Sequence, residues 1–218
     1  MPLLVALLVI LAAYLLGGVP WGLLLGRWLR GIDLREYGSG STGATNAART
    51  LGWRVSAAVF VLDLAKGAGA VVLARALTGD PLVEALAGVA AIAGHCWSPY
   101  IRFSGGRGVA TGIGGALAIA PWTLLLMVPI GLITIALTRY VSLASLIGTL
   151  AVPVGIIVGV ALGWLPAAAI VYGVAGAAII VVMHRGNIQR LLAGTERRLG
   201  ERVAAGGSAP AAKNSRAR

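Results

Sequence analysis

The sequence has few charged residues and very few side chains that bind metals. Only 11% of its 218 residues are charged, against about one-quarter in a typical soluble domain, and the chain holds seven acidic residues, two histidines and one cysteine. The lone Cys96 excludes an internal disulfide. Two histidines in separate segments give no ligand spacing for a metal ion, so we expect neither a metal nor any other cofactor.

Apolar residues and glycine are abundant instead. Hydrophobic residues make up 58% of the chain, glycine occurs 32 times, and the mean hydropathy is +0.90. This composition excludes an ordinary cytosolic enzyme, a disordered chain and a secreted disulfide scaffold. Because the sequence lacks the alternating pattern of β-barrel strands, it predicts an all-α integral membrane protein.

Long uncharged stretches mark the membrane spans. A hydrocarbon core of about 30 Å needs about 20 helical residues. The clear spans run over residues 3–26, 56–77, 82–101, 141–163 and 165–183. The first lacks a basic segment before it and is too long for a signal peptide, so we expect a retained helix.

The stretch 109–137 is either one kinked helix or two short ones meeting at Pro121-Trp122. The basic residues decide, because cytoplasmic loops are enriched in Lys and Arg. Two helices give seven spans and place nearly all the bases on one side; one helix would move the basic C-terminus outside. We therefore predict seven transmembrane helices, with the N-terminus outside and the C-terminus cytoplasmic. The helix over 109–120 would be about 18 Å long at about 1.5 Å per residue, so it is expected to start inside the protein body or to lie where the bilayer thins locally.

The chain shows no repeat and no second domain. Residues 1–202 are expected to form a single helical membrane domain with a cytoplasmic-face active site, and residues 203–218 a disordered basic tail. The formal net charge is +11. In a membrane protein such bases act first as topology determinants and contacts to lipid headgroups or phosphate, and nucleic acid is not expected as a partner.

Three polar segments fall on the predicted cytoplasmic face. The first reads GSGSTGATN over residues 38–46 and is followed by Arg49. Glycines let backbone N–H groups turn around an anion, hydroxyls add donors, and arginine suits phosphate geometry, so this segment resembles a phosphate cradle. It lacks the GK[ST] ending of a nucleotide-binding loop, and a flexible glycine-rich turn is the alternative.

The second segment is Gly94-His95 followed by FSGGRGVAT over residues 103–111. Arg107 precedes a predicted helix start, where free N–H groups and the helix dipole also favour an anion. In the third segment His184 and Asn187 lie three residues apart, on one face if the helix continues, and could polarise or deprotonate a substrate group. The alternatives are topology-determining arginines and a basic helix that holds acidic headgroups.

Asp63 and Lys66 lie at i and i+3 within a predicted span. Unpaired charges there are unfavourable, so we expect a structural ion pair that faces the bundle interior. No G-x-S-x-G or H-x-x-x-x-D motif occurs, and no Asp–His or Ser–His arrangement is evident from spacing.

Taken together, the segments resemble those of the bacterial membrane glycerol-3-phosphate acyltransferases that use acyl phosphate as donor. The motifs that carry the resemblance are GSGSTGATNAAR (38–49), DLAKG (63–67), GH with FSGGRGVAT (94–111), Ser142-Leu143 and HRGNIQRLLAGTE (184–196). Ser41 and Arg107 stand where that family more usually has Asn and Lys. Both keep hydrogen-bond donors, although Arg107 replaces a point charge by a planar fork.

The resemblance implies transfer of an acyl group from acyl phosphate to the 1-position of sn-glycerol 3-phosphate, the first acylation of phospholipid biosynthesis. The products would be lysophosphatidate and phosphate, and no metal or coenzyme A pocket would be needed. It further implies the bacterial inner membrane as location, membrane lipids as partners, and transient contact with the soluble enzyme that makes acyl phosphate. A membrane transporter of a phosphate ester is the alternative.

The resemblance also implies roles for individual residues. The catalytic set is Ser39, Arg49, Arg107, His184 and Asn187. The substrate-binding set is Gly38, Gly40, Ser41, Gly43, Thr45, Asn46, Lys66, His95, Gly105, Gly106, Gly108, Thr111 and Ser142. The catalytic base is left open between the phosphate of glycerol 3-phosphate and His184.

Overall fold

The structure is a computed structural model that describes residues 2–201, and within that range it is built of helices and turns without a β-strand. The predicted tail 203–218 lies outside the described residues. The α-helices are α1 (Leu3–Gly18), α2 (Trp21–Arg30), α3 (Ala44–Leu51), α4 (Trp53–Thr78), α5 (Pro81–Cys96), α6 (Val109–Ile119), α7 (Thr123–Thr138), α8 (Val141–Ala161), α9 (Ala169–Met183) and α10 (Arg185–Leu192). Two short 3₁₀ turns, η1 (Leu34–Glu36) and η2 (Pro99–Ile101), complete the set.

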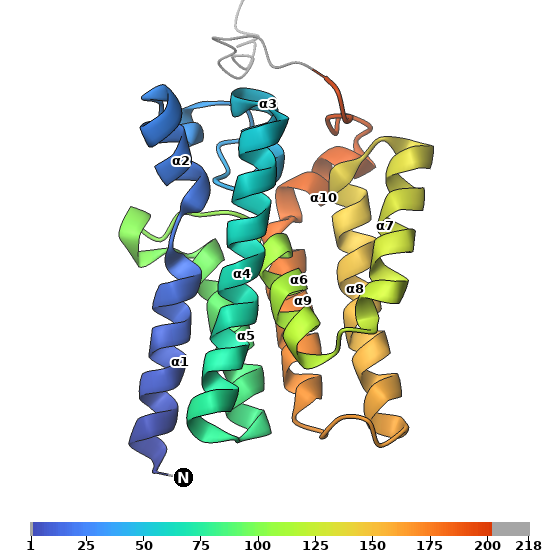
Figure 1. Ribbon diagram of the computed structural model, residues 1–218. Helices are drawn as coiled ribbons and strands as arrows, with labels where there is room; N and C mark the ends of the chain where they lie inside the picture. The colour runs from blue at the N-terminus through green and yellow to red at the C-terminus, as the bar shows by residue number, and fades with distance from the viewer. Residues whose placement is uncertain (1, 202–218) are drawn as a thin grey trace, which may run out of the picture.

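The long helices form a bundle in which α4 and α5 lie at the centre of many contacts. Helix α1 packs on α5 and α4, α6 packs on α4, and α9 packs on α5, while α7 pairs with α8 and α8 with α9 (Figure 1). Helices α2, α3 and α10 gather at the end of the bundle opposite the start of α1 (Figure 1). The polar segments of the sequence therefore lie together at one end.

The outer surface of the bundle is apolar. Leu8 on α1 is 55% exposed, and Leu125 on α7 is 76% exposed. Within residues 2–201, three helical segments are long and apolar enough to cross a membrane (Leu3–Arg30, Trp53–Thr78 and Val141–Ala161), and the bent pair α9–α10 would make a fourth. Helices that are apolar on all sides suit a lipid environment, because lipid covers the side chains that the bundle leaves exposed.

The first predicted span, 3–26, is interrupted. Helix α1 ends at Gly18 and α2 begins at Trp21, on either side of Val19 and Pro20. Proline lacks an N–H donor and disfavours helical geometry in the residue before it, which explains the break. The hydroxyl of Ser98 donates to the Gly18 carbonyl at 2.6 Å and so satisfies part of this broken backbone.

The α6–α7 boundary and the α9–α10 junction can be compared with the prediction from the sequence. The stretch 109–137 contains two helices, α6 and α7, separated at Pro121-Trp122, and the prediction of two short helices is confirmed. The last helix does not continue straight: α9 and α10 meet at His184 with a bend of 59°. The helix therefore does not continue in the way that would place His184 and Asn187 on one face of a straight helix, but both residues line the same cavity.

Candidate active site

The polar end of the bundle encloses a cavity of about 1360 Å³. The loop before α3, the loop before α6 and the α9–α10 junction all contribute to its wall. All the predicted site residues line this cavity except Lys66 and Thr111, which are buried elsewhere in the bundle with 4% and 0% of their surface exposed. Three segments far apart in the sequence therefore form one site.

The first loop is shaped by the side chain of Asn46. Its oxygen accepts a hydrogen bond from the Ser39 N–H at 2.9 Å, and its amide nitrogen lies within 3.0 Å of the carbonyl oxygens of Leu34, Tyr37 and Ser41. The side-chain amide of Asn46 therefore makes its hydrogen bonds with the backbone of this loop and holds the loop in shape. The backbone around Ser39 is held open toward the cavity.

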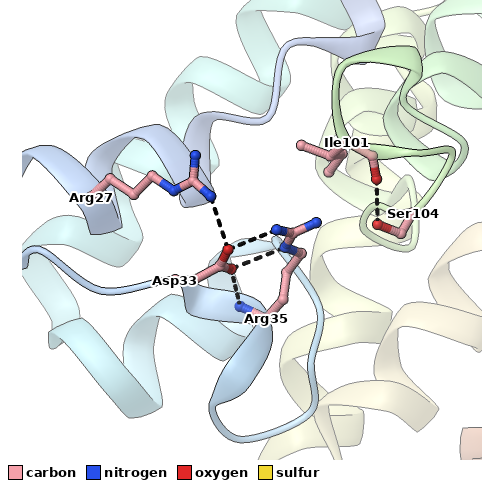
Figure 2. Close-up of polar contacts among 5 residues, drawn as sticks. All are labelled: Arg27, Asp33, Arg35, Ile101 and Ser104. Atoms are coloured by element: carbon pink, nitrogen blue, oxygen red, sulfur yellow. Dashed lines mark hydrogen bonds and ion pairs between the residues drawn. The ribbon is translucent and has the colours of Figure 1, made fainter.

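An ion cluster fixes the approach to this loop (Figure 2). Asp33 accepts hydrogen bonds from the backbone and guanidinium of Arg35, at 3.0 and 2.7 Å, and from Arg27 at 3.1 Å. The Arg35 hydrogen bonds outweigh the effect of partial burial and hold the pKa of Asp33 well below its ordinary value. Asp33 is thus ionised at neutral pH and anchors η1 just before the glycine-rich segment.

The second loop ends in the N-terminus of α6. The Ser104 hydroxyl donates to the Ile101 carbonyl at 2.7 Å within this loop (Figure 2). Gly108 has φ of +81° directly before the first turn of α6, a backbone conformation that glycine adopts without strain. Helices α3 and α6 therefore both begin at loops of the cavity, and their N-terminal N–H groups favour an anion there.

The third segment is held by Glu196. Its carboxylate accepts hydrogen bonds from Asn187 at 2.6 Å, Ser142 at 2.8 Å and Arg190 at 2.8 Å. Desolvation opposes ionisation of Glu196, but these three donors outweigh it and lower its pKa. The ring Nδ1 of His184 lies 2.8 Å from the Ile180 carbonyl, which makes Nδ1 the protonated nitrogen and leaves Nε2 as an acceptor.

Arg49 and Arg107 give the cavity its charge. Both side chains are half-buried and line the cavity, and neither forms an ion pair with a carboxylate of residues 2–201. Burial lowers the pKa of both guanidinium groups; the positive charge of neighbouring arginines adds to this effect, and the negative charge of Glu196 opposes it. An anion bound between them would remove this unfavourable concentration of charge.

The cavity continues from its polar end into an apolar part between the helices. Phe60 on α4 and Val128 and Leu132 on α7 line it and are 39%, 47% and 63% exposed. The cavity therefore opens sideways between α4 and α7, where lipid would surround the molecule. A polar head can occupy the arginine end while an alkyl chain extends toward the bilayer.

Sequence reasoning left two cavity residues out of the site. Glu196 belongs to the third motif but was given no role. It lies nine residues after Asn187, and the two side chains meet through the hydrogen bond between them. Asp63 was assigned to a structural pair, and that pair is confirmed with Lys66 Nζ 2.8 Å from Asp63 Oδ1. The same carboxylate oxygen lies 3.5 Å from His95 Nδ1, so an Asp–His pair that spacing did not reveal joins α4 to α5. Among the described residues, no three His, Cys, Asp or Glu side chains cluster in a way that could hold a metal ion.

The fold and the cavity define a helical protein with an apolar outer surface suited to a membrane and a cavity that is basic at one end and apolar between the helices. A family model described as glycerol-3-phosphate acyltransferase matches residues 7–194. The chain is 44% identical over 200 residues to a glycerol-3-phosphate acyltransferase of Synechococcus sp. (strain CC9902), covering 92% of this chain and 98% of the relative. It is also 44% identical over 198 residues to one of Desulforudis audaxviator (strain MP104C), covering 91% and 98%.

The chain belongs to the glycerol-3-phosphate acyltransferase family, and the resemblance seen in its motifs is confirmed. Its fold is similar to the crystal structure of PlsY (YgiH), an integral membrane glycerol 3-phosphate acyltransferase, in the glycerol 3-phosphate form. The TM-score is 0.82 at 37% identity, covering 89% of this chain and 96% of that one. The lysophosphatidic acid form of PlsY gives 0.80 at 36% identity, with 89% and 95% covered. The protein is an acyltransferase and a multi-pass membrane protein.

Proposed function

We propose that this protein transfers a fatty acyl group from acyl phosphate to the 1-hydroxyl of sn-glycerol 3-phosphate. The observation that carries the proposal is the pair of half-buried arginines, Arg49 and Arg107, at the polar end of a cavity whose other end is apolar. Both substrates bear phosphate, and one bears a long alkyl chain. The solved relatives in glycerol 3-phosphate and lysophosphatidic acid forms support the same substrate and product.

In this reaction the hydroxyl oxygen of glycerol 3-phosphate attacks the acyl carbonyl carbon. A new ester C–O bond forms, and the C–O bond between the acyl carbon and the donor phosphate breaks. The hydroxyl proton passes to the base and inorganic phosphate leaves, giving 1-acyl-glycerol 3-phosphate. No redox change or metal is required, so the protein contributes binding, orientation and stabilisation of the oxyanion.

The proposed roles follow the placement of the side chains. Ser39, Arg49 and Arg107, with the glycine-rich backbone of both loops, bind phosphate oxygens. Asn187 donates its amide N–H to Glu196, which leaves its carbonyl oxygen to accept a hydrogen bond from the acceptor hydroxyl. His184 lines the same cavity; with its Nδ1 proton held by Ile180, its Nε2 can take the proton, whereas polarising the acyl carbonyl would need the doubly protonated imidazolium.

The base is the phosphate of glycerol 3-phosphate or His184. Because Ile180 holds the Nδ1 proton of His184, Nε2 is the nitrogen available as a base. If His184 is the base, His184→Ala should nearly abolish kcat; if the substrate phosphate is the base, the variant should mainly raise KM. Steady-state kinetics with each substrate varied in turn will separate the two.

We further propose that the molecule is one membrane domain with seven spans in the bacterial inner membrane, with its N-terminus outside and its cavity facing the cytoplasm. The short helix α6 would begin inside the protein body beside the cavity. Acyl phosphate would arrive through transient contact with the soluble enzyme that makes it. Support comes from the basic residues of α2, α3 and α10 (Arg27, Arg30, Arg49, Arg185 and Arg190), since these helices gather at the polar end of the bundle (Figure 1).

The test is an acyl-transfer assay on the purified protein in detergent. Labelled glycerol 3-phosphate is supplied with palmitoyl phosphate in one reaction and palmitoyl-coenzyme A in another. We expect lysophosphatidate in the palmitoyl phosphate reaction only. Product from the thioester alone would reject the donor, and unchanged substrate in both reactions would favour transport of a phosphate ester.

A further inference from the structure

A buried polar chain runs from the broken first span to the second phosphate loop. Lys66 Nζ donates to the Val19 carbonyl at 2.9 Å and lies 2.8 Å from Asp63 Oδ1. Asp63 Oδ1 also lies 3.5 Å from His95 Nδ1. The side chains of Asp63, Lys66 and His95 are only 2%, 2% and 5% exposed.

His95 forms the surface on which the second loop lies. The Gly106 N–H donates to the His95 carbonyl at 3.1 Å. A Cβ atom at Gly105 would lie 2.1 Å from the His95 carbonyl oxygen, and one at Gly106 would lie 2.0 Å from the ring Nε2. No side chain fits at either position. The backbone of Gly105 therefore packs directly on the His95 backbone, and the backbone of Gly106 packs on the His95 ring.

The contact has a direct geometric consequence for Arg107, which follows Gly106 in the chain. A rotation of the His95 ring would displace Gly106 and move the Arg107 guanidinium relative to Arg49. Asp63 Oδ1 lies 3.5 Å from Nδ1 on the far side of the same ring, close enough for its charge to favour one orientation of the ring. Lys66 in turn fixes Asp63 and has no contact with the cavity.

We propose that Asp63 is a positioning residue for phosphate binding: held by Lys66, it orients His95 so that the loop 105–108 presents Arg107 to substrate. The inference rests on the proposed function and extends it. Asp63 is part of the cavity wall, and the role proposed for it is to act on the loop through His95. Its carboxylate is needed for the position of the loop as well as for charge balance in the bundle.

The first experiment compares Asp63→Asn with Gly106→Ala and with wild-type protein, with kcat and KM measured for both substrates. We expect Asp63→Asn to raise KM by on the order of tenfold or more, for the same substrate as Gly106→Ala, with a smaller change in kcat. The matched control is Glu84→Gln, which breaks an ion pair of 2.8 Å with Arg75 at the other end of α4. The control should change Tm and leave both KM values within about twofold of wild type.

The second experiment tests the path through His95. In the double variant Asp63→Asn/His95→Ala, the change in KM should match that of His95→Ala alone, because both substitutions remove the same support. A KM that rises by the product of the two single effects would overturn the relay. A drop in Tm with unchanged KM in Asp63→Asn, as in the control, would show that the carboxylate only stabilises the bundle.

A variant without the buried charges and a binding measurement separate loss of folding from loss of positioning. If Asp63→Asn does not fold because Lys66 is left unpaired, Asp63→Asn/Lys66→Met removes both buried charges and should fold with KM still raised. Calorimetric binding of glycerol 3-phosphate gives Kd without turnover. If wild-type protein binds glycerol 3-phosphate but forms no product, the proposed function fails, and a Kd unchanged by Asp63→Asn would overturn the positioning role separately.

Discussion

Arg107 differs from its neighbour Arg102 although both lie in the loop before α6. Arg107 is half-buried and lines the cavity, whereas Arg102 is exposed and does not contribute to its wall. Only Arg107 can therefore place its guanidinium against a bound phosphate. The difference between the two side chains makes a matched pair for mutation.

We expect Arg107→Gln to lower kcat/KM by about 10²–10³, the effect of removing one donor from a site that stabilises developing negative charge. Arg107→Lys should retain much more activity because a charge remains, although the planar fork is lost. Arg102→Gln should behave as wild type. Equal losses in Arg102→Gln and Arg107→Gln would mean that the loop contributes only general positive charge.

Glu196 makes stability depend on pH. Its pKa in the folded protein is below the ordinary value of 4.5. Its ionised form therefore contributes stability that is complete above that ordinary value and is lost as the pH falls below it. Thermal unfolding should show Glu196→Gln several degrees less stable than wild type at pH 7, with the difference shrinking as the pH approaches 4. A difference that is constant with pH would contradict the carboxylate's role.

The side chains that could be predicted from the sequence are those within a single motif. Arg49, Arg107 and Asn187 stand in glycine-rich or polar runs, and each lines the cavity. The Asp63–His95 pair could not be found this way, because its partners come from different helices and meet only when α4 packs on α5. Lys66 was expected at the substrate, but Asp63 and the Val19 carbonyl hold its ammonium group away from the cavity.

Helices α4 and α6 cross at very short range. A Cβ atom at Gly67 would lie 2.0 Å from the Thr111 carbonyl oxygen, so the two backbones touch where glycine stands. Gly69 lies two residues further along, on the opposite face of the same helix. A Cβ atom there would lie 3.9 Å from its nearest neighbour, a methyl carbon of Leu16. The pair separates the effect of a close crossing from that of helix propensity.

Gly67→Ala should therefore destabilise the protein by about 1–3 kcal/mol, because the crossing must open. Gly69→Ala should be neutral or stabilising, since alanine favours a helix over glycine by about 1 kcal/mol. Thermal unfolding in one detergent measures both. If Gly67→Ala unfolds no earlier than Gly69→Ala, α4 and α6 are not in backbone contact.

Helix existence was predictable from apolar length, while helix ends were not. The division of 109–137 at Pro121-Trp122 was predicted correctly, whereas the second proline, Pro129, lies inside α7 and does not end it. The break at Pro20 was missed because the apolar run continues through it to Gly26. The bend at His184 has no sequence breaker as strong as proline, and it arises where α10 leaves α9 to meet the cavity.

The proposed orientation in the bilayer has a direct chemical test. Cys96 is 1% exposed and can be replaced by Ser to give a background without reactive thiols. Single cysteines are then introduced by Phe103→Cys at the cavity end and Trp164→Cys in the α8–α9 connection, both exposed sites. A membrane-impermeant maleimide on intact cells should label Trp164→Cys alone, and both after lysis. Labelling of Phe103→Cys in intact cells would invert the topology.

Because the cavity opens sideways between α4 and α7, the rate of the reaction would be governed by the concentration of the acyl donor within the membrane and not by its concentration in bulk water. An acyl donor released into the membrane and entering past Phe60 and Leu132 would be drawn from the surrounding lipid, so the rate would depend on its mole fraction in the bilayer or micelle. Adding detergent at a fixed total amount of donor should therefore slow the reaction by surface dilution, while adding water should not. The cell could then regulate the first acylation through the lipid composition of the membrane as well as through the amount of enzyme.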